Sequence, residues 1–174
     1  MPSQTGSPNP DGQGGPQGPR TPPFLVRAFA SGLFSGYSPI ASGTVGSLVG
    51  LAFYWIPGFE QPYYIMPASV IVFLAGIKAG DIMEQYYGHD PAEVTIDEVL
   101  GMWFTLFLLP KSVVVAVAGF FVFRILDIVK PFPAKKFDAA TGGFGIMMDD
   151  VVSAFYSNLI LQLVFSIPFF RHFI

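Results

Sequence analysis

Five apolar stretches dominate the chain after residue 23, and the short segments between them carry its acidic residues. The stretches lie at 44–57, 63–80, 99–109, 112–126 and 151–170. Only 12% of the 174 residues are charged, against about a quarter in an average soluble domain. A helix needs about 20 apolar residues to cross a bilayer, so 63–80 and 151–170 are the plain candidates, while 99–109 and 112–126 could form a short hairpin. We therefore expect an all-α, membrane-embedded bundle with three to five apolar helices.

The first 23 residues have a different composition. They contain twelve Pro or Gly residues and a single hydrophobic residue, Met1. Such a segment cannot bury enough surface to offset the entropy lost on ordering. We expect a disordered tail over 1–23 and a single helical membrane domain over 24–174.

Composition also excludes several classes of function. The chain has no cysteine, which rules out a cysteine nucleophile, a zinc–thiolate site and an iron–sulfur cluster. Its net charge of −3 argues against a nucleic-acid partner.

The basic residues predict an orientation. If 80–98 and 127–150 face the cytoplasm, only Lys111 and Arg171 of the nine basic residues lie outside. The other seven lie inside: Arg20, Arg27, Lys78, Arg124, Lys130, Lys135 and Lys136. This asymmetry fits the positive-inside rule. It predicts a multi-pass protein with both acid-rich segments on the cytoplasmic face.

Three sets of carboxylates directly adjoin apolar stretches. They are Asp97 with Glu98, Asp127, and Asp149 with Asp150. An ionisable residue beside hydrocarbon is costly and is a functional-site hypothesis by default. Several carboxylates brought together repel one another unless a cation lies between them. Oxygen ligands without Cys or His suit a hard ion, with Mg²⁺ first.

Each acidic set also has a structural interpretation. Residues 95–98 fit a capping box, and residues 90–93 fit a second one with Pro at the first helical position. Asp149 and Asp150 could cap a helix that begins at Val151. For any one set, capping and chemistry remain alternatives, and the convergence of three sets on one face favours a shared site.

Two further features suit a phosphate group. Lys130 follows Asp127 by three residues, on the same face of a helix that runs to Pro131, although a lysine that snorkels to the membrane interface is an equal alternative. Residues 42–47, Ser-Gly-Thr-Val-Gly-Ser, open a helix whose N-terminus attracts anions. Gly46 and Gly50 could instead serve close helix packing.

Four long motifs, in this order, resemble the phosphatidylglycerophosphatase A family. They are Ala41–Ser47, Asp90–Trp103, Phe123–Pro133 and Gly142–Asp150. The resemblance implies an all-helical, Mg²⁺-dependent enzyme of the bacterial cytoplasmic (inner) membrane. Its expected partner is a phospholipid substrate in the bilayer, phosphatidylglycerophosphate, which loses its terminal phosphate to leave phosphatidylglycerol.

Residues and resemblance together predict a site. Its expected metal ligands are Asp97, Glu98, Asp127, Asp149 and Asp150. Glu98, Asp149 and Asp150 are also expected to be catalytic, and Lys130, Gly43, Thr44 and Gly46 to bind substrate. The expected mechanism is direct attack on phosphorus by metal-activated water, with an acyl-phosphate intermediate on one Asp as the alternative. The alternative function is a small ion-coupled transporter, which would more often bury its acids at mid-span.

Overall fold

The computed structural model describes residues 21–168, and this part of the chain contains seven α-helices, one 3₁₀-helix and no strand. The predicted all-α class is confirmed. Residues 1–20, most of the predicted disordered tail, lie outside the described residues. The elements in chain order are α1 Phe24–Ala30, the 3₁₀-helix η1 Ser35–Tyr37, α2 Ser42–Tyr54, α3 Pro62–Tyr87, α4 Ile96–Leu106, α5 Val113–Val129, α6 Ala134–Asp138 and α7 Gly143–Ser166.

Each of the five apolar stretches forms a helix, in order α2, α3, α4, α5 and α7. Within the described residues, α3 and α7 are long and apolar enough to cross a membrane, by length and composition. The helices α1 and α6 were not predicted, because they are short and lack a long apolar run.

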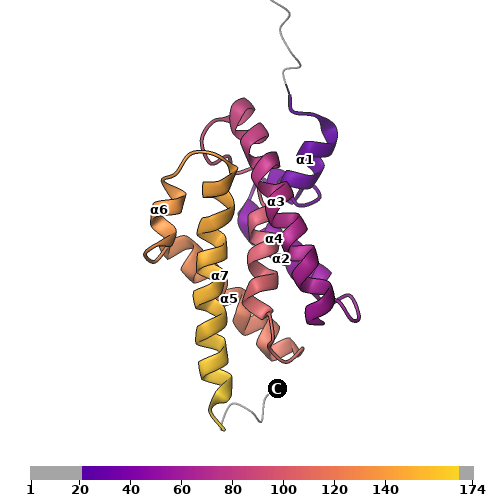
Figure 1. Ribbon diagram of the computed structural model, residues 1–174, viewed down its shortest axis with the longest axis vertical. Coiled ribbons are helices and arrows are strands. Elements are labelled where there is room, and N and C mark those ends of the chain that lie inside the picture. The colour runs from indigo at the N-terminus through magenta and orange to yellow at the C-terminus, as the bar shows by residue number, and fades with distance from the viewer. Residues whose placement is uncertain (1–20, 169–174) are drawn as a thin grey trace, which may run out of the picture.

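Helix α4 lies at the centre of the bundle, with α3 and α7 on either side of it (Figure 1). Nine of its eleven residues are buried, so its apolar side chains form the core. The side chain of Asn158 on α7 donates to the carbonyls of Thr105 (3.0 Å) and Phe107 (2.8 Å). These bonds satisfy carbonyl groups that the end of α4 leaves free, which lets a short helix end inside the bundle.

Small residues bring α2 close to α4. A Cβ added at Gly46 would lie 2.7 Å from the Cβ of Thr95, and one at Gly50 would lie 2.7 Å from the carbonyl oxygen of Val99. The indole N–H of Trp103 also donates to the carbonyl of Gly50 at 3.0 Å. The packing interpretation of Gly46 and Gly50 is therefore confirmed, and it holds the start of α2 over the start of α4.

The α2–α3 and α4–α5 connections meet at one end of the bundle. Lys111 donates to the carbonyl of Ile56 at 3.1 Å, and its Nζ lies 2.7 Å from Glu60 Oε2. Both connections lie at the lower end in Figure 1. This end carries few acids.

The other end joins the two acid-rich segments. The backbone N–H groups of Gly142 and Gly143, at the start of α7, donate to Glu84 (2.9 Å) and Asp81 (2.7 Å) of α3. The α3–α4 and α6–α7 connections both lie toward this upper end in Figure 1. Segments 80–98 and 127–150 thus lie toward the same end of the molecule, as the predicted orientation requires.

Candidate active site

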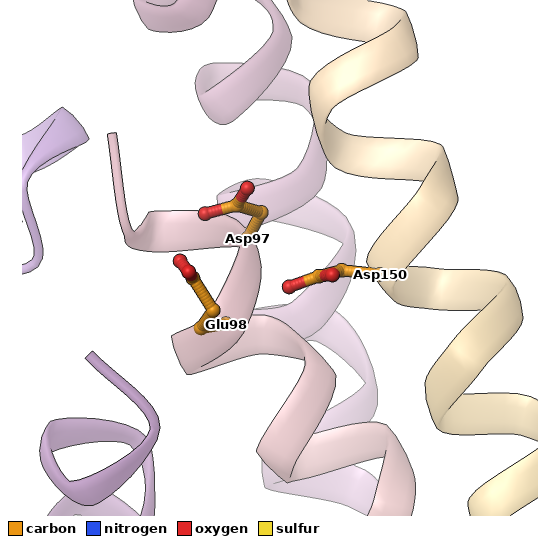
Figure 2. A group of neighbouring side chains, drawn as sticks. All are labelled: Asp97, Glu98 and Asp150. Atoms are coloured by element: carbon orange, nitrogen blue, oxygen red, sulfur yellow. The ribbon is translucent and has the colours of Figure 1, made fainter. Parts of the chain in front are cut away.

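Three carboxylates from two helices converge beside the start of α4. Asp97 and Glu98 lie in the first turn of α4, and Asp150 lies on α7. One oxygen of each lies within 4.8 Å of the others, and Figure 2 shows the three groups gathered around a common point. The chain thus brings together residues that are more than fifty positions apart in sequence.

One oxygen of each of these carboxylates lacks a partner. Asp97 Oδ1, Glu98 Oε2 and Asp150 Oδ2 are buried and accept no hydrogen bond from the described residues. A buried acceptor without a donor is costly and calls for an explanation. Three carboxylates that lie close together and each keep one unpartnered oxygen, with no nitrogen or sulfur ligand among them, fit a hard divalent cation such as Mg²⁺.

The capping interpretations of the acidic sets are wrong. Thr95 precedes α4, but its side chain makes no capping hydrogen bond and its Oγ1 lies 2.9 Å from Ser35 Oγ. Residues 90–93 open no helix, since α4 begins only at Ile96. Asp149 and Asp150 lie inside α7, which begins at Gly143.

All five predicted metal ligands line one cleft of about 370 Å³. Lys130 and Gly43 line it too. A Cβ at Gly43 would clash with Glu98 Oε1 and would lie 2.9 Å from Arg124 Nη1, so a larger residue there would displace the ends of these two side chains. Thr44 is not among the lining residues, and Gly46 packs on Thr95. The substrate contacts expected of Thr44 and Gly46 have no support from this geometry and stay predictions.

Asp149 lines the same cleft but does not belong to the group of three. Its Oδ2 accepts a hydrogen bond from Lys130 Nζ at 2.6 Å, and its Oδ1 accepts one from the backbone N–H of Asp150 at 2.9 Å. Lys130 ends α5 in a left-handed conformation (φ 48°) and also donates to Asp138. Burial by itself would lower the pKa of Lys130, but its bonds to Asp138 and Asp149 outweigh burial and raise that pKa above its usual value.

Arg124 also lines the cleft, although it is not among the expected site residues. Its Nη1 donates to Asp127 Oδ2 at 2.7 Å and lies 3.9 Å from Glu98 Oε1. The signal was present in the sequence, because Arg124 and Asp127 stand three positions apart on one helix. The cleft therefore holds two cations, Arg124 and Lys130, beside its acids.

Asp90, which the sequence favours as a helix cap, also lines the cleft. It has a left-handed backbone (φ 46°), uncommon outside glycine and often seen at functional sites. Burial raises the pKa of Asp90, and the charge of Lys130 opposes this rise. The neighbouring His89 ring lies 2.7 Å from Glu84 Oε1, and this hydrogen bond raises the pKa of His89.

Comparisons with known proteins agree with the four motifs. The family model described as phosphatidylglycerophosphatase A matches residues 28–165. A protein of Escherichia coli K12 named phosphatidylglycerophosphatase A is 40% identical over 142 residues, which cover 78% of this chain and 80% of that protein. A Haemophilus influenzae protein of the same name is 31% identical over 148 residues, covering 83% and 89%.

A third relative carries a different name. This protein of Bacteroides thetaiotaomicron, named "Putative phosphatidylinositol-3-phosphatase", is 37% identical over 150 residues, covering 82% of this chain and 94% of its own length. No solved structure matches the chain. The family model spans most of the chain, and all three relatives are covered over at least four fifths of their length. The chain belongs to the phosphatidylglycerophosphatase A family of phosphatases.

Proposed function

We propose that this chain removes the terminal phosphate of phosphatidylglycerophosphate in the cleft between α2, α4, α5 and α7. The names of the Escherichia coli and Haemophilus influenzae relatives support the substrate. The observation that carries the proposal is the set of three partnerless carboxylate oxygens in a cleft that also holds Arg124 and Lys130. An anion with a metal beside it suits such a mixture of charges.

Asp97, Glu98 and Asp150 would hold Mg²⁺, and Asp127, which lines the same cleft, is the next candidate ligand. When bound, Mg²⁺ would neutralise charge on the phosphoryl group and lower the pKa of water. The group of three acids would need this positive charge, because Arg124 approaches only one of them, Glu98.

The chain's own cations would bind the phosphate. Lys130 Nζ is held by Asp149 and Asp138, so a phosphate oxygen would take a third hydrogen bond from the same ammonium group or replace one of these two. Arg124, which lines the same cleft, would donate a further hydrogen bond to the phosphate. Both cations would stabilise the negative charge that spreads over the phosphoryl oxygens during transfer.

Asp149 is suited to orient the attacking water. It lies beside the three-carboxylate group and yet points toward Lys130. The water oxygen would form a bond to phosphorus while the bond between phosphorus and the glycerol oxygen breaks. One water proton would pass to a carboxylate of the cleft, and the glycerol oxygen would take up a proton. The products would be phosphatidylglycerol and inorganic phosphate.

We also propose that the chain crosses the bacterial inner membrane several times with this cleft toward the cytoplasm. Two helices of sufficient length, the apolar α2 and the predicted excess of basic residues on the acid-rich side support this orientation. The family gives no support to the transporter alternative.

Phosphate release from phosphatidylglycerophosphate in detergent micelles tests the proposal. We expect turnover with Mg²⁺, loss of turnover after exhaustive chelation, and recovery when Mg²⁺ is restored. Phosphatidylinositol 3-phosphate should be included, because one relative bears that activity in its name. Full turnover after chelation would overturn the metal assignment, and a clear preference for the inositol lipid would overturn the substrate assignment.

A further inference from the structure

The cleft is open at an apolar surface. Ile128 of α5 lines the cleft and is also 73% exposed. The exposed Ala41, just before the start of α2, lines the cleft as well. The preceding residue, Ile40, is 78% exposed. A cleft that served only a water-soluble substrate would have no need of large exposed apolar residues at its edge.

Ile128 is the last member of an exposed apolar stripe on α5. Its members follow one another at intervals of three or four residues and so share one face of the helix. They are Val114, Val117, Phe121, Ile125 and Ile128. At 1.5 Å per residue the stripe is about 21 Å long, which exceeds one bilayer leaflet of about 15 Å of hydrocarbon. In the proposed membrane orientation, the stripe would therefore connect the bilayer interior to the cleft.

Helix α5 carries both cations that could bind a phosphate head group and an apolar stripe that could bind acyl chains. Arg124 and Lys130 present cations to the cleft at the end of α5, and the stripe runs from that point toward the other end of the bundle. We propose that the acyl chains of the substrate lie along this stripe while the head group enters the cleft sideways between Ala41 and Ile128. This proposal rests on the proposed function and adds the route by which the lipid reaches the site.

The absence of cysteine permits a clean test. Ile125→Cys places a single thiol on the stripe one turn from the cleft edge, and Ile71→Cys places one on the outward face of α3, where Ile71 is 67% exposed. Each purified, folded variant is labelled with a bulky maleimide, so the perturbation follows folding. Two substrates with the same head group are then compared: long-chain phosphatidylglycerophosphate and its deacylated, water-soluble counterpart.

We expect the label at Ile125 to lower kcat/KM for the long-chain lipid by about tenfold relative to the deacylated compound, which is the equivalent of roughly two buried methylene groups. The label at Ile71 should leave this ratio unchanged. Equal ratios for the two labelled variants would overturn the proposal. So would a loss at Ile125 that is the same for both substrates, or a change in oligomeric state on labelling at Ile125, which would identify the stripe as a contact between two copies.

A second measurement does not depend on turnover. Excess long-chain lipid should slow the reaction of the Ile125 thiol with maleimide more than that of the Ile71 thiol, and the deacylated compound should slow neither. Equal protection at the two positions would contradict the route. Absence of phosphate release from both substrates by the unlabelled chain would instead contradict the proposed function, so the two failures are distinguishable.

Discussion

Replacing Asp150 by asparagine should stabilise the metal-free protein and abolish its response to Mg²⁺. Asn keeps the shape of Asp but removes its charge. A structural carboxylate, such as one that caps a helix, lowers stability when it is neutralised. A carboxylate that lies among other carboxylates in a cation site raises the stability of the metal-free protein when it is neutralised, because the loss of its charge relieves repulsion.

The geometry gives the magnitude. Oxygens of Asp97, Glu98 and Asp150 lie within 4.8 Å of one another, and two unit charges at that distance repel by about 3.5 kcal/mol at an effective dielectric constant of about 20. Proton uptake by the group relieves part of this energy. We therefore expect Asp150→Asn to raise the metal-free free energy of unfolding by about 1–3 kcal/mol, or the midpoint of thermal unfolding by roughly 2–10 °C.

The assay is thermal unfolding in detergent, with chelator and with Mg²⁺. Mg²⁺ at a hundred times its dissociation constant should stabilise the native chain by about 2.7 kcal/mol and should have little effect on Asp150→Asn, whose turnover should fall by about 10²-fold or more. Asp81→Asn is the matched control, because Asp81 accepts the backbone N–H of Gly143 at the start of α7. It should destabilise the chain by about 0.5–1 kcal/mol and keep the Mg²⁺ response. A metal-free Asp150→Asn protein that is less stable than the native chain and still stabilised by Mg²⁺ would refute this reasoning.

Three further outcomes are expected. Lys130→Ala should lower kcat/KM by about 10- to 100-fold, mainly through KM, because the phosphate charge is present before reaction; a purely kcat effect would restrict Lys130 to the transition state. Single cysteines at Tyr86 and Ala139, in an otherwise cysteine-free chain, should be labelled from the same side of sealed vesicles, and labelling from opposite sides would exclude the proposed orientation. The NMR titration midpoint of His89 should lie above its usual value of about 6.5 and should return toward that value in Glu84→Gln. Because the pKa of His89 is raised in the folded chain, the stability that the His89–Glu84 pair adds should be present below about pH 6.5. That stability should be lost as the pH rises through the folded midpoint.

The sequence predicted those helices that coincide with long apolar stretches. The five apolar stretches became α2, α3, α4, α5 and α7, because an apolar run can satisfy its backbone in a membrane only as a helix or a closed barrel. The sequence could not predict where α7 begins. Its first turns lie beyond the apolar stretch, where Asp81 and Glu84 accept the free N–H groups of Gly143 and Gly142, and these contacts are tertiary.

The candidate site likewise contains residues that the sequence could predict and residues that depend on tertiary contacts. The cost of carboxylates beside hydrocarbon identified Asp97, Glu98, Asp127, Asp149 and Asp150, and all five line one cleft. Charge beside an apolar helix is a local property and can be read from a sequence. The positions of Arg124 and Asp90 depend on which helices face each other, and the guanidinium of Arg124 lies close to Gly43 of α2, far away in the sequence.

Asp149 and Asp150 are neighbours on α7 that contact different parts of the cleft. Neighbouring residues on a helix point about 100° apart, so the pair cannot serve one ion from the same direction. The structure resolves this constraint by directing Asp150 to the carboxylates of α4 and Asp149 to Lys130. A single turn of α7 therefore fixes the position of the three-carboxylate group relative to Lys130. A shift of α7 by one residue along its axis would break both the contact of Asp150 with the α4 carboxylates and that of Asp149 with Lys130. The hydrogen bonds from Gly142 and Gly143 to α3 oppose such a shift, because they hold the start of α7 in place.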